Sequence, residues 1–149
     1  MNIANIIAEN ALRNRRLTTF YDPISGRDAG GVRRQTTVEW EEGPVWLPVT
    51  MLESPEFPLL RSRQAYMMLR FRHDFDYWCA TCITVRQKRT GNIVPLILNA
   101  PQRKVVAEFE ADRLAGRPIR IILLKARQWG GSLLYIYSCI YKWLIFRRQ

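Results

Sequence analysis

The stretch Arg120–Ser132, with the sequence RIILLKARQWGGS, has the residue types and spacing of a phosphate-binding loop. Such a loop needs a buried strand before it, small residues that let backbone N–H groups approach phosphate oxygens, and a helix whose N-terminus faces the charge. The apolar run Ile121–Leu124 predicts a strand covered on both faces, as in a parallel sheet. Gly130 and Gly131 supply the small residues.

A helix is predicted from Ser132 onward because apolar residues recur at three- and four-residue spacing. They are Leu133, Ile136, Tyr137, Ile140 and Leu144. This stripe predicts a buried helix. The apolar stretch Leu133–Phe146 contains Lys142 and is shorter than the roughly 20 residues that cross a bilayer, so no membrane segment is expected.

The cations of the loop depart from the usual pattern GxxxxGK[ST], in which lysine reaches the β- and γ-phosphates and the hydroxyl binds Mg²⁺. With Gly130 as the second glycine, Ser132 takes the hydroxyl position and Gly131 stands in place of the lysine. Lys125 stands at the front of the loop, from which its long side chain can fold back to phosphates. Arg127 adds a second cation. The alternative is a Gly-Gly turn with two solvated cations.

A second candidate lies upstream, in Asn99-Ala100-Pro101-Gln102-Arg103. Pro101 suits the first turn of a helix, which is predicted to run to Leu114. The amide of Gln102 could donate to adenine N7 and accept from adenine N6, a way of choosing adenine over guanine. Local hydrogen bonds to the backbone are the alternative role for this side chain.

Weaker patterns organise the remainder of the chain. Helices are predicted over residues 2–17 and 59–69, the second with a basic face of Arg61, Arg63 and Arg70 that is either hydrated or in contact with DNA. Residues 22–31 are rich in turn formers, and residues 37–49 indicate a short hairpin or an extended arm. A further hairpin is predicted, with strands over 79–85 and 93–98.

Three cysteines, Cys79, Cys82 and Cys139, provide no disulfide framework. Cys79 and Cys82 form a CxxC pair, but a structural zinc site needs four ligands and no second pair exists. We therefore expect buried strand cysteines. Because residues 1–10 lack a basic region, no secretory signal is expected, and the predicted location is the cytoplasm.

Charge separates the two halves of the chain. The chain has 149 residues, 23 Lys and Arg against 13 Asp and Glu, and a net charge of +10. Residues 1–75 carry ten basic and nine acidic side chains, whereas residues 76–149 carry thirteen and four. A positive field of this kind suits nucleotide phosphates or a DNA backbone. Hydrophobic content of 48% is that of a globular protein and excludes global disorder.

The strings KARQWGGS, LNAPQRKV and FRHDFDYW resemble segments of the large terminase subunit of tailed bacteriophages, the ATP-driven motor that packages DNA. The resemblance covers roughly residues 71–146. It implies an α/β, P-loop NTPase-like fold, with a partial parallel sheet flanked by helices. Residues 1–70 would form an irregular or helical N-terminal arm and connector, and residues 71–149 the N-terminal part of the ATPase domain.

The resemblance also implies roles for individual residues. Gln102 would read adenine, Lys125 would pair with the β- and γ-phosphates, Arg127 would contact the γ-phosphate, and Ser132 would hold Mg²⁺. The nucleotide-binding set would be Gln102, Lys125, Ala126, Arg127, Gln128, Trp129, Gly130, Gly131 and Ser132, with Lys125 and Arg127 as catalytic residues. The implied cofactors are ATP and Mg²⁺.

The implied partners are double-stranded DNA, portal protein and the small terminase subunit, in a homo-oligomeric motor in the host cytoplasm. ATP hydrolysis also needs an acidic Walker B strand, and no carboxylate follows Ser132. We therefore expect a truncated or split terminase that binds nucleotide weakly and does not hydrolyse it. Two alternatives remain, a small basic nucleic-acid-binding module and an interaction protein that docks through the aromatic residues Trp40 and Trp46.

Overall fold

The computed structural model describes residues 21–28, 33–38, 43–123 and 130–146. The chain divides into two compact units, Met1–Ile97 and Leu98–Gln149. The boundary predicted after residue 70 falls inside helix α3 (Arg63–His73), and the division between the two compact units falls after Ile97. The helix predicted over residues 2–17 and the side chain of Trp40 lie outside the described residues.

The first strands described in the first unit form a hairpin. Strand β1 (Arg33–Thr36) pairs with β2 (Val45–Pro48) in antiparallel register, with Arg33 opposite Pro48. A hairpin was predicted here, but its first strand lies a few residues earlier than expected. The preceding turn packs against β2, because the Trp46 amide donates to the Ser25 carbonyl at 2.7 Å. Gly26 permits this approach, since its φ is +72° and a Cβ there would lie 1.9 Å from the Trp46 oxygen.

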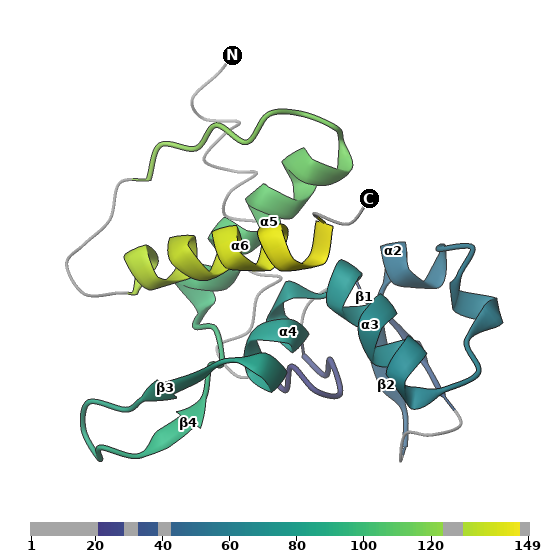
Figure 1. Ribbon diagram of the computed structural model, residues 1–149, viewed down its shortest axis with the longest axis horizontal. Helices are drawn as coiled ribbons and strands as arrows, with labels where there is room; N and C mark the ends of the chain where they lie inside the picture. The colour runs from purple at the N-terminus through teal and green to yellow at the C-terminus, as the bar shows by residue number, and fades with distance from the viewer. Residues whose placement is uncertain (1–20, 29–32, 39–42, 124–129, 147–149) are drawn as a thin grey trace. The chain divides into compact units, whose positions relative to one another are not determined.

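The core of the first unit forms where the hairpin meets three short helical segments. These are α2 (Val49–Leu52), the 3₁₀ helix η1 (Phe57–Leu59) and α3 (Arg63–His73), and Figure 1 shows the hairpin against α3. The alternating residues Val45 and Leu47 of β2 point inward, as a half-buried strand requires. They join Met51, Tyr66 and Leu69 in one buried cluster.

A buried ionic cluster centred on Asp74 links the hairpin to α3. Two N–H groups of Arg33 donate to the two Asp74 oxygens at 2.7 and 2.8 Å, and Arg70 Nε donates at 3.2 Å. Arg70 also donates to the Tyr66 hydroxyl and the Pro23 carbonyl, and its guanidinium lies 3.8 Å from the Tyr77 ring centroid. Since Arg70 and Asp74 are buried, these contacts replace the water that both charges have lost.

The stability of the first unit should decrease in acid because of Asp74. Burial raises the pKa of this carboxyl, but the charge and hydrogen bonds of Arg33, with Arg70, outweigh burial and hold the pKa below its ordinary value. A group whose pKa is lower in the folded state stabilises it fully above the unfolded pKa of about 3.9, and less as pH falls. Urea unfolding between pH 6 and pH 3 should therefore show falling stability, and Asp74→Asn should flatten this dependence. An equal slope in both proteins would contradict the assignment.

The predicted basic face on α3 is wrong. Arg70 is fully buried, and Arg61 precedes the helix and donates to the Pro58 and Leu60 carbonyls. The sequence pattern placed three arginines on one helical surface, whereas Arg70 points into the core because Asp74 lies one helical turn later to accept from it.

Helix α4 (Phe75–Cys82) follows, with the Asp74 side chain accepting from the Tyr77 amide at its N-terminus. It leads into a second hairpin, β3 (Thr84–Arg86) and β4 (Ile93–Pro95), as predicted, although residues 79–82 are helical and not a strand. Cys79 is buried on α4 and burial raises its thiol pKa, whereas Cys82 is exposed. The described residues contain no cluster of metal ligands.

The described part of the second unit contains two helices and an extended segment, residues 117–123, that follows the first of them. Helix α5 (Ala100–Leu114) agrees with the prediction, and α6 (Gly131–Phe146) begins one residue before the predicted start. Two cation–π contacts join them, from Arg113 to the Phe146 ring at 5.1 Å and from Lys142 to the Phe109 ring at 5.3 Å. The contacts occur in the same order along both helices, so α5 and α6 run in the same direction (Figure 1).

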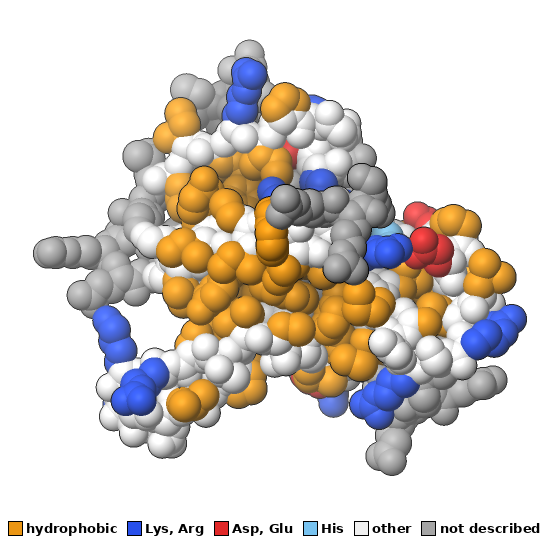
Figure 2. All heavy atoms as spheres, in the orientation of Figure 1, with side chains coloured by type: hydrophobic (Ala, Val, Ile, Leu, Met, Phe, Trp, Pro, Cys, Tyr) orange, Lys and Arg blue, Asp and Glu red, His pale blue; other side chains and the backbone are white. Residues whose placement is uncertain are grey.

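The predicted buried face of α6 is wrong. The buried positions are Gly131, Leu134, Ser138 and Tyr141, whereas Leu133, Ile136, Ile140 and Leu144 are exposed. Figure 2 shows hydrophobic side chains gathered over α6. Since α6 is apolar on all sides, its periodicity identified a helix but could not choose the packed face. None of the described helices is long and apolar enough to cross a membrane.

The protein is a mixed α/β chain. Each of the sheets in the described residues is an antiparallel pair, β1–β2 or β3–β4, and none has parallel strands. Ile121–Leu123 form no strand in the structure, contrary to the prediction, while Leu124 lies outside the described residues. Ile122 is 93% exposed, so no neighbouring strand covers this residue.

Candidate nucleotide-binding site

The predicted adenine reader, Gln102, lies in a capping box at the start of α5. The side-chain Oε1 of Gln102 accepts from the backbone N–H of Asn99 at 2.9 Å. In return, the backbone N–H of Gln102 donates to Asn99 Oδ1 at 3.0 Å. Two otherwise unpaired N–H groups at the helix start are thereby satisfied. Gln102 thus makes the local hydrogen bonds to the backbone that were considered from the sequence as its alternative role. Its side-chain amide could read adenine only if Oε1 released the Asn99 N–H and accepted from the base instead.

The remaining donor of Gln102 reaches the glycine loop. Its Nε2 donates to the Gly130 carbonyl at 3.4 Å, across 28 positions of sequence. Gly130 has a φ of +83°, and a Cβ at this position would lie 2.6 Å from Gln102 Nε2. Both the backbone conformation and the approach of the glutamine therefore favour glycine at position 130. Two segments identified separately from the sequence meet at this contact.

The Gly130 carbonyl also accepts the first hydrogen bond of α6, from the Leu134 amide at 3.0 Å. Gly131 is the buried first residue of that helix, and Ser132 is exposed in its first turn. The N-terminus of a helix carries a partial positive charge and directs N–H groups outward, which suits an anion. Ser132 adds one hydroxyl oxygen at this end of the helix.

The central loop residues are not placed. Lys125, Ala126, Arg127, Gln128 and Trp129 lie outside the described residues. The structure thus brings Gln102, Gly130, Gly131 and Ser132 to one end of the second unit. The positions of the two candidate catalytic cations remain predictions from the sequence.

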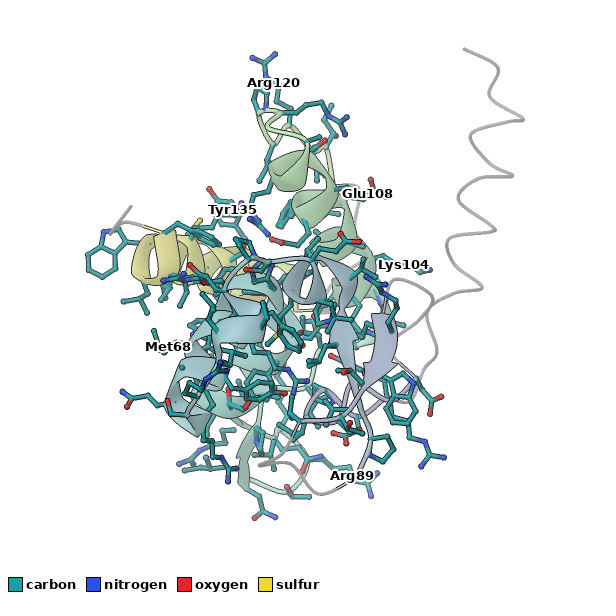
Figure 3. All side chains as sticks on the ribbon, turned by 90° about the vertical axis from the view of Figure 1, so that its right-hand side faces the viewer. Met68, Arg89, Lys104, Glu108, Arg120 and Tyr135 are labelled. Atoms are coloured by element: carbon teal, nitrogen blue, oxygen red, sulfur yellow. The ribbon has the colours of Figure 1, made fainter. Side chains whose placement is uncertain are left out.

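A pocket of about 340 Å³ lies between α5, the extended segment and α6. Its lining is mainly apolar, and it includes Gly131 at the start of α6 and Lys142 near the other end of that helix. The full lining is Val105, Phe109, Ile119, Ile121, Leu123, Gly131, Leu134, Tyr135, Ser138, Cys139 and Lys142. In Figure 3, Lys104 and Glu108 mark α5, Tyr135 marks α6 and Arg120 marks the extended segment. Gln102 is not among the lining residues, so the pocket and the Gln102–Gly130 contact are separate features.

The described residues fit Mg²⁺ only as an ion that accompanies a nucleotide. Mg²⁺ is usually held by one or two carboxylates together with substrate phosphates and water. Near the start of α6 the chain offers the Ser132 hydroxyl, and no cluster of acidic ligands exists among the described residues. The phosphates of the nucleotide and water would have to supply most of the Mg²⁺ ligands.

Sequence reasoning missed the Asp74 cluster. Arg33 is 41 positions from Asp74 in the chain, so only the spacing of Arg70 and Asp74, one helical turn, was a usable signal. Comparison of the chain with protein-family models, with curated proteins and with solved structures found no match.

Proposed function

We propose that this chain is the ATP-binding part of a large terminase subunit, whose parent protein couples ATP hydrolysis to DNA packaging. The observation that carries the proposal is the hydrogen bond from Gln102 to Gly130. It joins the segment LNAPQR to the loop segment WGGS, which belong to two of the three strings on which the resemblance rests. A basic module with an unrelated Gly-Gly turn would not require these two segments to meet.

The arrangement of the second unit supports the P-loop fold as part of the proposal. Two helices that run in the same direction must be joined by a segment that returns along them, and Ile119–Leu123 makes this return beside both helices. In α/β proteins with a parallel sheet, the returning segment between neighbouring helices on one face is a strand. We propose that this segment, which pairs with no strand among the described residues, takes the place of a strand in such a sheet.

Each residue then has a defined role. Lys125 and Arg127 neutralise charge on the β- and γ-phosphates, and the N–H groups of residues 129–131 contact phosphate oxygens. Phosphoryl transfer depends mainly on such positioning and neutralisation. Mg²⁺, held by the phosphates and Ser132, would neutralise further charge. Gln102 Nε2 donates to the Gly130 carbonyl of the loop, and the same side chain reads adenine after Oε1 releases the Asn99 N–H.

The test is ATP binding by the full chain, measured by calorimetry with Mg²⁺ present. Wild type should bind, and Lys125→Ala should weaken binding by roughly tenfold or more, because a charge contact to phosphate is lost. Lys104→Ala is the matched control. It removes the same charge from the same unit, at a partly exposed position on α5, and should leave the affinity unchanged.

Two results would overturn the proposal. One is the absence of ATP binding by the wild-type chain at millimolar concentration. The other is an equal loss in both lysine variants, which would mean that only net charge matters. ATP hydrolysis is expected to be undetectable in this chain, since no carboxylate follows Ser132 to activate water.

A further inference from the structure

The β3–β4 hairpin carries an unpaired cationic surface. Arg86, Lys88 and Arg89 are all exposed, and residues 83–97 contain no acidic side chain. In Figure 1 the hairpin extends away from α4, and Figure 2 shows Lys and Arg side chains gathered at its end. Arg89, labelled in Figure 3, lies in the turn.

The turn is fixed by its own hydrogen bonds. The backbone N–H of Gln87 donates to the backbone carbonyl of Asn92, and the backbone N–H of Gly91 donates to the backbone carbonyl of Gln87, both at 2.8 Å. The Thr90 hydroxyl donates to Gln87 Oε1 at 2.7 Å. A turn held in this way presents Lys88 and Arg89 from an ordered backbone, which lowers the entropic cost of binding a partner.

These three cations differ from most other arginines of the first unit. Arg27, Arg34 and Arg72 lie within 4 Å of Asp28, Glu53 and Glu56, and Arg33 and Arg70 both pair with Asp74. Arg86, Lys88 and Arg89 form no salt bridge with any described residue. Their positive charge is therefore available to an external polyanion.

The composition of the hairpin selects the kind of polyanion. Residues 83–97 contain no aromatic side chain, whereas proteins that bind single strands stack bases on aromatic rings. A two-stranded ribbon fits the major groove of B-form DNA but not the deep, narrow groove of A-form RNA. These features favour contact with the phosphate backbone of a DNA duplex.

We propose that the β3–β4 hairpin is a DNA-binding element, in which Arg86, Lys88 and Arg89 contact backbone phosphates without reading sequence. The surface is independent of the nucleotide site, because it lies in the first unit and needs no ATP. It extends the proposed function by naming the residues that would meet the DNA.

The test compares two triple variants of the full chain, both with net charge reduced by three. One is Arg86→Gln, Lys88→Gln, Arg89→Gln. The control is Arg27→Gln, Arg34→Gln, Arg117→Gln, whose side chains are 72%, 57% and 63% exposed and already paired with acidic partners. Circular dichroism should show that both remain folded, since exposed ion pairs contribute little to stability. Binding to a labelled duplex of random sequence is measured without nucleotide at several salt concentrations.

The hairpin variant should lose roughly tenfold or more in affinity, and its salt slope should fall by about 2.7, for three phosphate contacts. The control should keep the wild-type slope. Equal losses in the two variants, stronger hairpin-dependent binding to duplex RNA, or no DNA binding by wild type would each overturn the inference. Lys125→Ala should bind DNA normally, so failure of the hairpin and failure of the nucleotide site give different results.

Discussion

Replacement of Asp74 with Asn should lower the free energy of unfolding by about 3–5 kcal/mol, the usual cost of removing one partner from a buried ion pair. Asn has the same shape and retains an oxygen for the Tyr77 amide. It has no charge, however, so Arg33 and Arg70 would remain buried beside each other without the carboxylate that both contact. Urea unfolding at pH 7, followed by circular dichroism, measures the change.

Glu53→Gln is the control for this prediction. Glu53 pairs with Arg34 at 3.3 Å, but both side chains are more than half exposed, at 65% and 57%. An exposed pair contributes about 1 kcal/mol or less, so this variant should unfold nearly as wild type does. If Asp74→Asn were as mild as Glu53→Gln, the ionic cluster would not hold the first unit together.

Gly130→Ala should both destabilise the second unit and abolish the proposed ATP binding. A non-glycine residue at a φ of +83° costs about 1–2 kcal/mol. The added Cβ would also lie 2.6 Å from Gln102 Nε2 and displace the amide that contacts the Gly130 carbonyl. The start of α6 would then lose the support on which the site depends. Thermal unfolding and ATP calorimetry on the same samples give the two readouts.

Gly116→Ala separates the two causes. Gly116 has a φ of +64°, in the same unit, but a Cβ there meets no atom within 4 Å. It should show the backbone penalty alone and bind ATP normally. If Gly116→Ala lost ATP binding as Gly130→Ala does, general destabilisation would explain the effect and the Gln102–Gly130 contact would not.

The local elements of the fold followed from the sequence where a local signal existed. The Asn99–Pro101–Gln102 pattern placed the start of α5, and the KRTGN turn placed the β3–β4 hairpin. The three- and four-residue spacing of apolar residues located helix α6 in the sequence, but it did not identify the face of the helix that is buried. Leu133 and Leu134 are equally apolar, so only tertiary packing decided that Leu134 is buried.

Long-range features could not be read in this way. The Arg33–Asp74 pair joins residues 41 positions apart, and a surface salt bridge and a buried one look the same in sequence. The strand expected at Ile121–Leu123 was inferred from an apolar run, but a strand forms only when a partner supplies hydrogen bonds. For the candidate site, the residue types could be predicted from the sequence, while the contact of Gln102 with Gly130 came from the packing of α5 against α6.

The most direct test of the nucleotide-binding proposal is the backbone amide spectrum of the full ¹⁵N-labelled chain during titration with ATP and Mg²⁺. Binding at the start of α6 should shift the signals of Gly130, Gly131 and Ser132, together with the side-chain amide of Gln102, and Lys125→Ala should suppress these shifts. Shifts confined to the first unit, or none at saturating ATP, would contradict the proposal.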